Sequence, residues 1–284
     1  MPGVDPAAEA LRVPADCVGR AEEASEIAQA EPLQRLAAVL EADWPLSPGD
    51  PVPPGWHWAY FLPRTRQGRL GPEGHAGEGL LPPLRGLRRM WAGSRFDFTG
   101  LLRIGAPLIR RSRIRAAEVK RGRSGPFILL SLEHEIAGPD GSLREDQDLV
   151  FRPAAGGPAS APPSASPPSP RPDFERELRP DPVLLFRFSA VTFNAHRIHY
   201  DRPYATGVEG YPDLVVHGPL QALLMLDLVH RARPEARVAG FTFRAERPAF
   251  LPHALSIRGR ASAGGFDLWI EAAGLVTSRG RVEG

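Results

Sequence analysis

The sequence is poor in cysteine. Cys17 is the only one among 284 residues, so an internal disulfide is impossible and a cysteine metal cluster is excluded. Cys17 lies in a polar N-terminal segment that we expect to be frayed, where its thiol is a bystander rather than a nucleophile.

Long apolar runs are also missing. No stretch approaches the roughly 20 apolar residues that a membrane helix needs. The first twenty residues contain Asp5 and Glu9 and no apolar run, which argues against a presequence. We therefore expect no membrane association, and a cytoplasmic enzyme or binding protein.

Lysine is almost absent, since Lys120 is the only one. The isoelectric point is near 9.0, yet the formal net charge is only +2. No block of consecutive basic residues occurs, and arginine clusters such as Arg88 and Arg89 are short. Nucleic acid is therefore not an expected partner. The phosphates of coenzyme A could be met by Arg88, Arg89, Arg103 and Arg113, although a solvated surface is the simpler interpretation.

Proline, alanine and serine dominate one internal segment. Residues 155–172 carry almost no large apolar side chain and cannot form a core. We therefore predict an N-terminal domain over residues 1–152, a linker over residues 153–180 and a C-terminal domain over residues 181–284.

Apolar periodicity predicts the secondary structure of both halves. A helix is expected over residues 32–43, and a long covering loop with an aromatic cluster over residues 45–86. Alternating or apolar runs predict strands, with a hairpin turn at residues 138–142. The expected strands cover residues 94–100, 107–121, 126–138, 148–152, 183–193, 238–250, 254–263 and 266–274.

The segment 218–232 reads GPLQALLMLDLVHRA and predicts a helix that is apolar on nearly all sides. Such a helix has to be enclosed. One helix wrapped by antiparallel strands is the hotdog arrangement, so we predict an α+β double hotdog with two such units. The first half shows no equally clear central helix, and we expect a shortened or irregular one within residues 56–90.

A loose internal match suggests duplication. Phe96 aligns with Phe243, Leu101 with Pro248 and Leu108 with Leu255, at a constant offset. Together with the linker, this match indicates two related halves.

Polar side chains crowd immediately before the apolar helix, in FNAHRIHYD (193–201) and VVHGPLQ (215–221). With LPPLRGLRRMWAGSRFDF in the first half, these motifs resemble the MaoC-like hydratases and dehydratases. The resemblance is closer to the branch with a FAS1-like dehydratase N-terminal half, which includes hydroxyacyl-thioester dehydratase type 2 and the mesaconyl-CoA and itaconyl-CoA hydratases. It implies an acyl-CoA substrate, no cofactor and no metal, and an N-terminal half without catalytic residues. By analogy it also implies a homodimer or larger homo-oligomer.

The resemblance implies three catalytic positions. His199 matches the family's histidine and Gly218 the glycine at the helix start, whereas Asn194 stands where the family has an aspartate. His199 could carry protons near neutrality. The N–H of Gly218 could form an oxyanion hole, since helix N-termini favour negative charge. Asn194 cannot act as a base but could orient water or the imidazole.

Four further residues are candidates for substrate binding. Arg197 could pair with the free carboxylate of a dicarboxylic acyl group, or could lie on the surface. His196 could serve a supporting role, His217 could cap the helix or line the pocket, and Tyr200 could line the pocket or simply pack. A zinc site from HxxHxD is a weak alternative.

We therefore predict a hydro-lyase, an enoyl-CoA hydratase or 3-hydroxyacyl-thioester dehydratase for a short branched or dicarboxylic acyl group. One alternative is a dehydratase of carrier-protein thioesters in fatty acid synthesis. A thioesterase is a second alternative, against which Asn194 counts because a carboxylate usually activates water there. A non-catalytic acyl-CoA-binding protein is a third.

Overall fold

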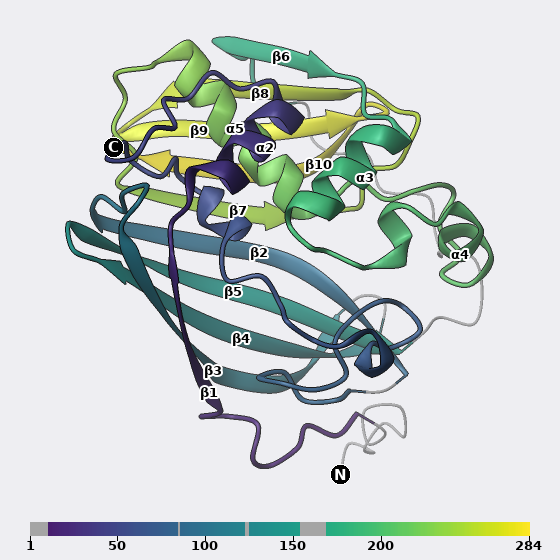
Figure 1. Cartoon of the computed structure of the whole chain (residues 1–284). Coiled ribbons are helices and arrows are strands. Elements are labelled where there is room, and N and C mark those ends of the chain that lie inside the picture. Colours follow the sequence, from purple (N-terminus) through teal and green to yellow (C-terminus); the bar gives the residue numbers. More distant parts are fainter. Residues whose placement is uncertain (1–10, 85, 123–124, 154–168) are drawn as a thin grey trace.

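One antiparallel sheet of ten strands organises the computed structural model, which describes residues 11–84, 86–122, 125–153 and 169–284. The strand order is β1-β3-β4-β5-β2-β7-β10-β9-β8-β6 (Figure 1). The strands are β1 (Ala21–Ile27), β2 (Leu87–Gly100), β3 (Pro107–Gly122), β4 (Gly125–Gly138), β5 (Gly141–Pro153), β6 (Phe174–Leu178), β7 (Gly240–Ala245), β8 (Leu255–Ser262), β9 (Gly265–Ala272) and β10 (Leu275–Glu283). The α-helices are α2 (Ala30–Leu40), α3 (Pro182–Val191), α4 (Arg202–Gly207) and α5 (Gly218–Ala232), and the 3₁₀ turns are η1 (Trp56–Ala59), η2 (Gln67–Arg69) and η3 (Arg197–His199).

The two halves of the sheet have the same topology. Strands β1 to β5 lie in the order 1-3-4-5-2, and β6 to β10 repeat that order in reverse across the β2–β7 pair. In this pair Phe96 lies opposite Phe241, and Ser94 lies opposite Phe243. The offset that equates Phe96 with Phe243 also equates Arg95 with Thr242, and these two residues lie opposite each other, so a two-fold axis relating the halves can pass between them. The constant offset found in the sequence therefore matches the geometry of two duplicated halves.

Helix α5 is enclosed as its composition predicts. It packs against β6, β8, β9 and β10, and every side chain from Leu220 to Val229 is buried. Its polar side chains have partners, because Gln221 Oε1 accepts hydrogen bonds from Thr277 and Ser278 of β10. Asp227 accepts from Arg176 of β6 at 2.9 Å. No helix in the described ranges is both long and apolar enough to cross a bilayer.

The strand predicted over residues 183–193 is wrong, because this segment forms α3. Asp181 caps the helix by accepting a hydrogen bond from Leu184 N at 2.7 Å, and Pro182 occupies the first turn. Leu185, Phe188 and Ser189 are buried at helical spacing. The apolar run carried no alternation, so its Asp-Pro start was the more reliable signal.

The shortened or irregular helix expected within residues 56–90 corresponds to the 3₁₀ turns η1 and η2, the only helical turns among the described residues of that range. Frequent proline and glycine prevent a longer helix there. The α-helix of the first half in the described ranges is α2, which follows β1 as α3 follows β6 and packs against α3 and η1. The covering loop over residues 45–86 is confirmed, and His57 and Trp58 of η1 bond the buried carboxylate of Glu145 in β5.

Other boundaries also differ from the prediction. The sequence did not indicate β1 or β10, whereas the hairpin between β4 and β5 is confirmed by the Gly138–Gly141 pair. Strand β6 pairs with β8 inside the predicted linker, whose residues 154–168 lie outside the described ranges. Cys17 is fully buried rather than frayed, in a cluster with Leu11 and Ile114.

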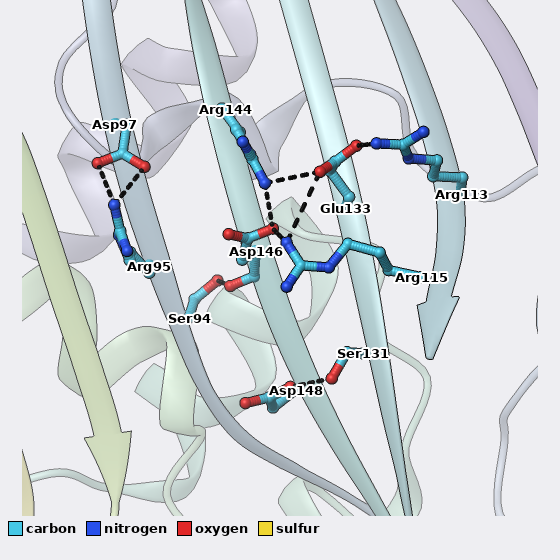
Figure 2. A network of polar contacts seen from close by, with 10 residues as sticks. All are labelled: Ser94, Arg95, Asp97, Arg113, Arg115, Ser131, Glu133, Arg144, Asp146 and Asp148. Carbon is cyan, nitrogen blue, oxygen red and sulfur yellow. Dashed lines mark hydrogen bonds and ion pairs between the residues drawn. The ribbon is translucent and has the colours of Figure 1, made fainter. Parts of the chain in front are cut away.

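A charged network covers the outer face of the first half (Figure 2). At its centre lies Glu133 of β4, whose side chain is only 4% exposed and is bonded by Arg113 at 2.5 Å and Arg144 at 2.7 Å. Arg115 and Arg144 also contact Asp146. Glu133 is thus a buried carboxylate neutralised by arginines that remain half-exposed themselves.

Replacing Glu133 with glutamine should lower the free energy of unfolding by about 1–3 kcal/mol, the usual worth of charged hydrogen bonds at a buried group. The matched control is Arg95→Gln on the same face, because the Arg95–Asp97 pair is exposed at both ends and should contribute less than about 1 kcal/mol. Urea unfolding of the two variants measures both values. Equal effects would contradict the central role of Glu133.

Candidate active site

The loop after α3 carries the predicted catalytic motif. Thr192 ends the helix, and Phe193 adopts a left-handed conformation with φ of 49°. The backbone N–H of Asn194 then donates to Ser189 O at 2.8 Å, which fixes the start of the loop. From the first half, Glu73 O accepts a hydrogen bond from Arg197 N at 2.9 Å. The motif is therefore held by both halves of the chain.

His199 is buried, and its tautomer is determined by one contact. Its Nδ1 lies 2.8 Å from the carbonyl oxygen of Val215. Because a carbonyl only accepts hydrogen bonds, Nδ1 carries the proton and Nε2 keeps its lone pair. Burial lowers the pKa of His199 to about 4, so the imidazole is neutral at pH 7. His199 is thus arranged as a base through Nε2.

The start of α5 lies beside this imidazole. The ring of His217 stacks on His199 with 3.6 Å between centroids, and Gly218 follows directly. Pro219 has no N–H, and the N–H of Gly218 has no acceptor among the described residues. A free N–H and the positive end of a helix dipole therefore lie next to the base.

The indole ring of Trp91 in β2 packs against Gly218. A Cβ at position 218 would lie 2.6 Å from Cε3 of Trp91. The Trp91 ring stacks on Phe243 and meets the edge of Trp58. Only glycine therefore fits between the helix start and this packed indole.

His217 does not cap the helix. It occupies the N-cap position of α5 without a side-chain capping bond. Its Nε2 lies 2.8 Å from Ser189 Oγ, and Nδ1 is buried without a partner in the described part of the chain. Burial lowers the pKa of His217 well below its usual value. Of the two predicted roles, the geometry favours lining the site.

Among the described residues, the side-chain amide of Asn194 has a hydrogen-bond partner at its oxygen only. Its Oδ1 accepts a hydrogen bond from His196 N at 3.0 Å. Its Nδ2 makes no hydrogen bond to the described residues and is available to water or substrate. The amide can therefore donate at the position where the family's aspartate would accept.

His196 connects the motif to the first half. Its ring lies 5.6 Å from that of His199 and 4.2 Å from that of His75, centroid to centroid. Burial lowers the pKa of His196 to about 3. Arg89 of β2 donates to His75 Nδ1 at 2.6 Å. Four imidazoles, from residues 75, 196, 199 and 217, thus form a continuous row.

Arg197 and Tyr200 lie outside this row. The Arg197 guanidinium bonds Asp201 at 2.7 and 2.9 Å and the carbonyl of Pro72 at 3.0 Å, and it stacks over Tyr204. These contacts hold the loop and leave Arg197 little capacity for substrate. Tyr200 is exposed and donates to the carbonyl of Ala195. Their predicted roles in substrate binding have no support in these contacts.

No group of three or more histidine, cysteine or acidic side chains in the described ranges is arranged to hold a metal ion. The histidine row instead consists of rings in mutual contact, with Nδ1 of His199 committed to a backbone carbonyl.

Similarity to known proteins identifies the family of this chain. Residues 55–251 match the family of hydroxyacyl-thioester dehydratase type 2. The chain belongs to this family. It is 42% identical over 238 residues to the mesaconyl-C(4)-CoA hydratase of Chloroflexus aurantiacus, which covers 82% of this chain and 84% of that protein. The predicted family is confirmed, and this dehydratase-family chain is an enzyme of the hydro-lyase class.

Two solved structures confirm the double hotdog fold. The HtdX protein of Mycobacterium tuberculosis superposes with a TM-score of 0.68 at 20% identity, covering 93% of this chain and all of that one. A second protein of that organism, described as having a double hotdog fold, gives 0.58 at 15% identity and covers 98% and 97% of the two chains.

The histidine row predicts that this dehydratase-family enzyme loses stability in mild acid. Unfolded histidine titrates near ~6.5, whereas burial lowers the pKa of His196 to about 3 and of His199 to about 4. Between these values the unfolded state binds more protons, so stability falls as pH falls, by about 1.4 kcal/mol per pH unit for each such histidine. Urea unfolding between pH 8 and 5 measures this slope. His196→Gln should give a shallower slope, and an unchanged one would refute the assignment.

Three residues near the site come from the first half, and the sequence did not predict their roles. Arg89 and Trp91 share the inner face of β2, and His75 lies in the covering loop. In the sequence, Arg89 resembled one of many surface arginines. The signal that could have identified it is its position two residues before Trp91, because alternate residues of a strand face the same side.

Proposed function

We propose that this enzyme adds water reversibly to an enoyl thioester of coenzyme A, with His199 as the proton carrier. The observation that supports this proposal is the pairing of a buried imidazole, whose Nε2 is free, with the unbonded N–H of Gly218. A base and an oxyanion donor at the two ends of one conjugated system are what the reaction needs.

In the first step, Nε2 of His199 takes a proton from water while the water oxygen bonds to the β-carbon. The electron pair of the C=C bond moves toward the thioester, whose oxygen gains enolate charge. The N–H of Gly218 and the helix dipole stabilise that charge. Nδ2 of Asn194 donates to the attacking water and orients it, since an amide cannot take its proton.

In the second step the enolate collapses and the α-carbon takes the proton from the His199 imidazolium. One histidine thus accepts and returns the same proton, and the 3-hydroxyacyl thioester leaves with one added water. The reverse sequence is dehydration. A single proton carrier removes the need for the carboxylate that Asn194 replaces.

The substrate we favour is a short dicarboxylic or branched enoyl group such as mesaconyl-CoA or itaconyl-CoA. The similarity to a mesaconyl-C(4)-CoA hydratase over most of both chains supports this choice. A carrier-protein thioester is the alternative within the same chemistry. Association of copies through sheet edges stays a prediction.

The test is the loss of enoyl-thioester absorbance with crotonyl-CoA, mesaconyl-CoA and itaconyl-CoA, together with crotonyl groups on an acyl carrier protein. Turnover of a dicarboxylic substrate at the highest kcat/KM is the expected result. Preference for the carrier-protein thioester would replace the proposed substrate. Binding without turnover of any of them would mean a non-catalytic acyl-CoA-binding protein.

A further inference from the structure

Arg89 is a cation that has no counter-ion among the described residues. It lies on the inner face of β2, partly buried beneath the covering loop, where its guanidinium donates to His75. Burial lowers the pKa of Arg89 to about 10, and the charge of Glu73 opposes this shift. Among the described residues no carboxylate, including Glu73, lies within ion-pair distance of it.

Several other partly buried arginines in the described ranges form ion pairs. Arg88, the neighbour of Arg89 in sequence, contacts Glu209 at 2.7 Å, and Arg176 contacts Asp227 at 2.9 Å. A buried charge without a partner is costly, and proteins commonly keep one where a ligand supplies the opposite charge. Arg89 therefore indicates an anionic ligand.

His75 has an unsatisfied donor in the same place. A guanidinium only donates, so Nδ1 of His75 accepts from Arg89 and the proton of this neutral imidazole lies on Nε2. Nε2 of His75 is buried without a partner in the described part of the chain. An acceptor on a ligand would satisfy it, because buried donors are rarely left unbonded.

The position of this pair relates it to the reacting atoms. His75 contacts His196, and His196 contacts His199, with 4.2 and 5.6 Å between successive centroids. On the same strand face, Trp91 borders Gly218. Arg89 and His75 therefore lie within two imidazole contacts of His199, where the proposed reaction takes place.

We propose that Arg89 and His75 form the subsite for the free carboxylate of a dicarboxylic acyl group. This inference deepens the proposed function and rests on it for the identity of the acyl-CoA ligand. A carboxylate supplies both the charge that Arg89 lacks and the acceptor that His75 lacks. The role first predicted for Arg197 thus passes to Arg89, because Arg197 is already paired with Asp201.

Calorimetric binding of two saturated ligands tests the subsite without requiring turnover. Succinyl-CoA and butyryl-CoA have acyl groups of equal length and differ in a terminal carboxylate against a methyl group. The wild type should bind succinyl-CoA more tightly. In Arg89→Met this affinity should fall about 10- to 100-fold while that for butyryl-CoA stays within about threefold, as expected for loss of a charged hydrogen bond.

Arg95→Met is the matched control, since it removes an arginine from the outer face of the same strand, and both affinities should stay unchanged. Arg89→Lys keeps the positive charge but loses the planar pair of N–H donors of the guanidinium. Its affinity for succinyl-CoA should lie between those of the wild type and of Arg89→Met. If Arg89→Met does not fold, Arg89→Lys is the variant that tests the subsite. Equal weakening of both ligands, or no preference in the wild type, would overturn the subsite. A retained preference without hydration of any enoyl-CoA would overturn the proposed function alone.

Discussion

Replacing His199 with alanine is expected to lower kcat by about 10²- to 10⁴-fold, the usual contribution of a positioned acid/base group. The large effect follows from the proposed use of one imidazole for both proton transfers. His199 is also fixed in one tautomer by Val215, so water in the space left by the ring would not reproduce its orientation. Initial rates on the preferred enoyl-CoA measure the loss.

Asn194→Ala is the comparison for this variant, because the amide only orients water and its removal should cost less than removal of His199. Calorimetry with butyryl-CoA should show that His199→Ala still binds ligand. Retention of more than about a tenth of kcat would exclude His199 as a general acid/base of ordinary strength.

The pH profile adds an independent check on the same residue. The neutral imidazole is the base, so kcat/KM should persist as pH falls and be lost near the lowered pKa of about 4. Unfolding in mild acid must be separated from this titration by following tryptophan fluorescence at each pH. A fall in kcat/KM near pH ~6.5 with the protein still folded would indicate an exposed histidine instead.

Gly218→Ala is expected to have the second-largest effect. Its Cβ would lie 2.6 Å from Trp91, which Phe243 and Trp58 hold in place. The helix start must therefore move, which removes the N–H from the enolate oxygen. We expect kcat to fall about 10²- to 10³-fold, as for loss of one oxyanion donor, and the free energy of unfolding to fall by about 1–3 kcal/mol from overpacking.

Gly207→Ala controls for the substitution itself, because a Cβ there would meet nothing within 4 Å. The double variant Gly218→Ala/Trp91→Leu should recover part of the lost stability, since the indole that clashes is gone. Unchanged kcat in Gly218→Ala would exclude the N–H of Gly218 as the oxyanion donor.

Local sequence patterns predicted the parts of this protein that depend on local interactions. Helix α5 begins and ends at the predicted residues, and its mainly apolar composition made it recognisable in the sequence. The strands around the β4–β5 hairpin were recognisable from their alternation and turn. By contrast, the run at residues 183–193 has no period that separates helix from strand, and the capping by Asp181 decides between them.

The candidate site also contains residues that the sequence predicted and residues that only the structure revealed. His199, Asn194 and Gly218 were predicted from one short stretch, and the fold places His199 beside the start of α5. Arg89 and Trp91 reach that place from more than a hundred residues away through the β2–β7 pair. Pairing between distant strands leaves no periodic signal in a single sequence, so their roles could be recognised only in three dimensions.

The β2–β7 pair also determines what would follow if the gene were split between its halves. In the described sheet, β1 and β6 are the outer strands, and β2 and β7 cover each other's backbone. Each half expressed alone would expose that edge, which is a template for aggregation. The C-terminal fragment would keep His199 but lose the indole that borders Gly218. Fission of the gene would therefore yield a soluble catalyst only where the two fragments are produced together and reassemble along this edge.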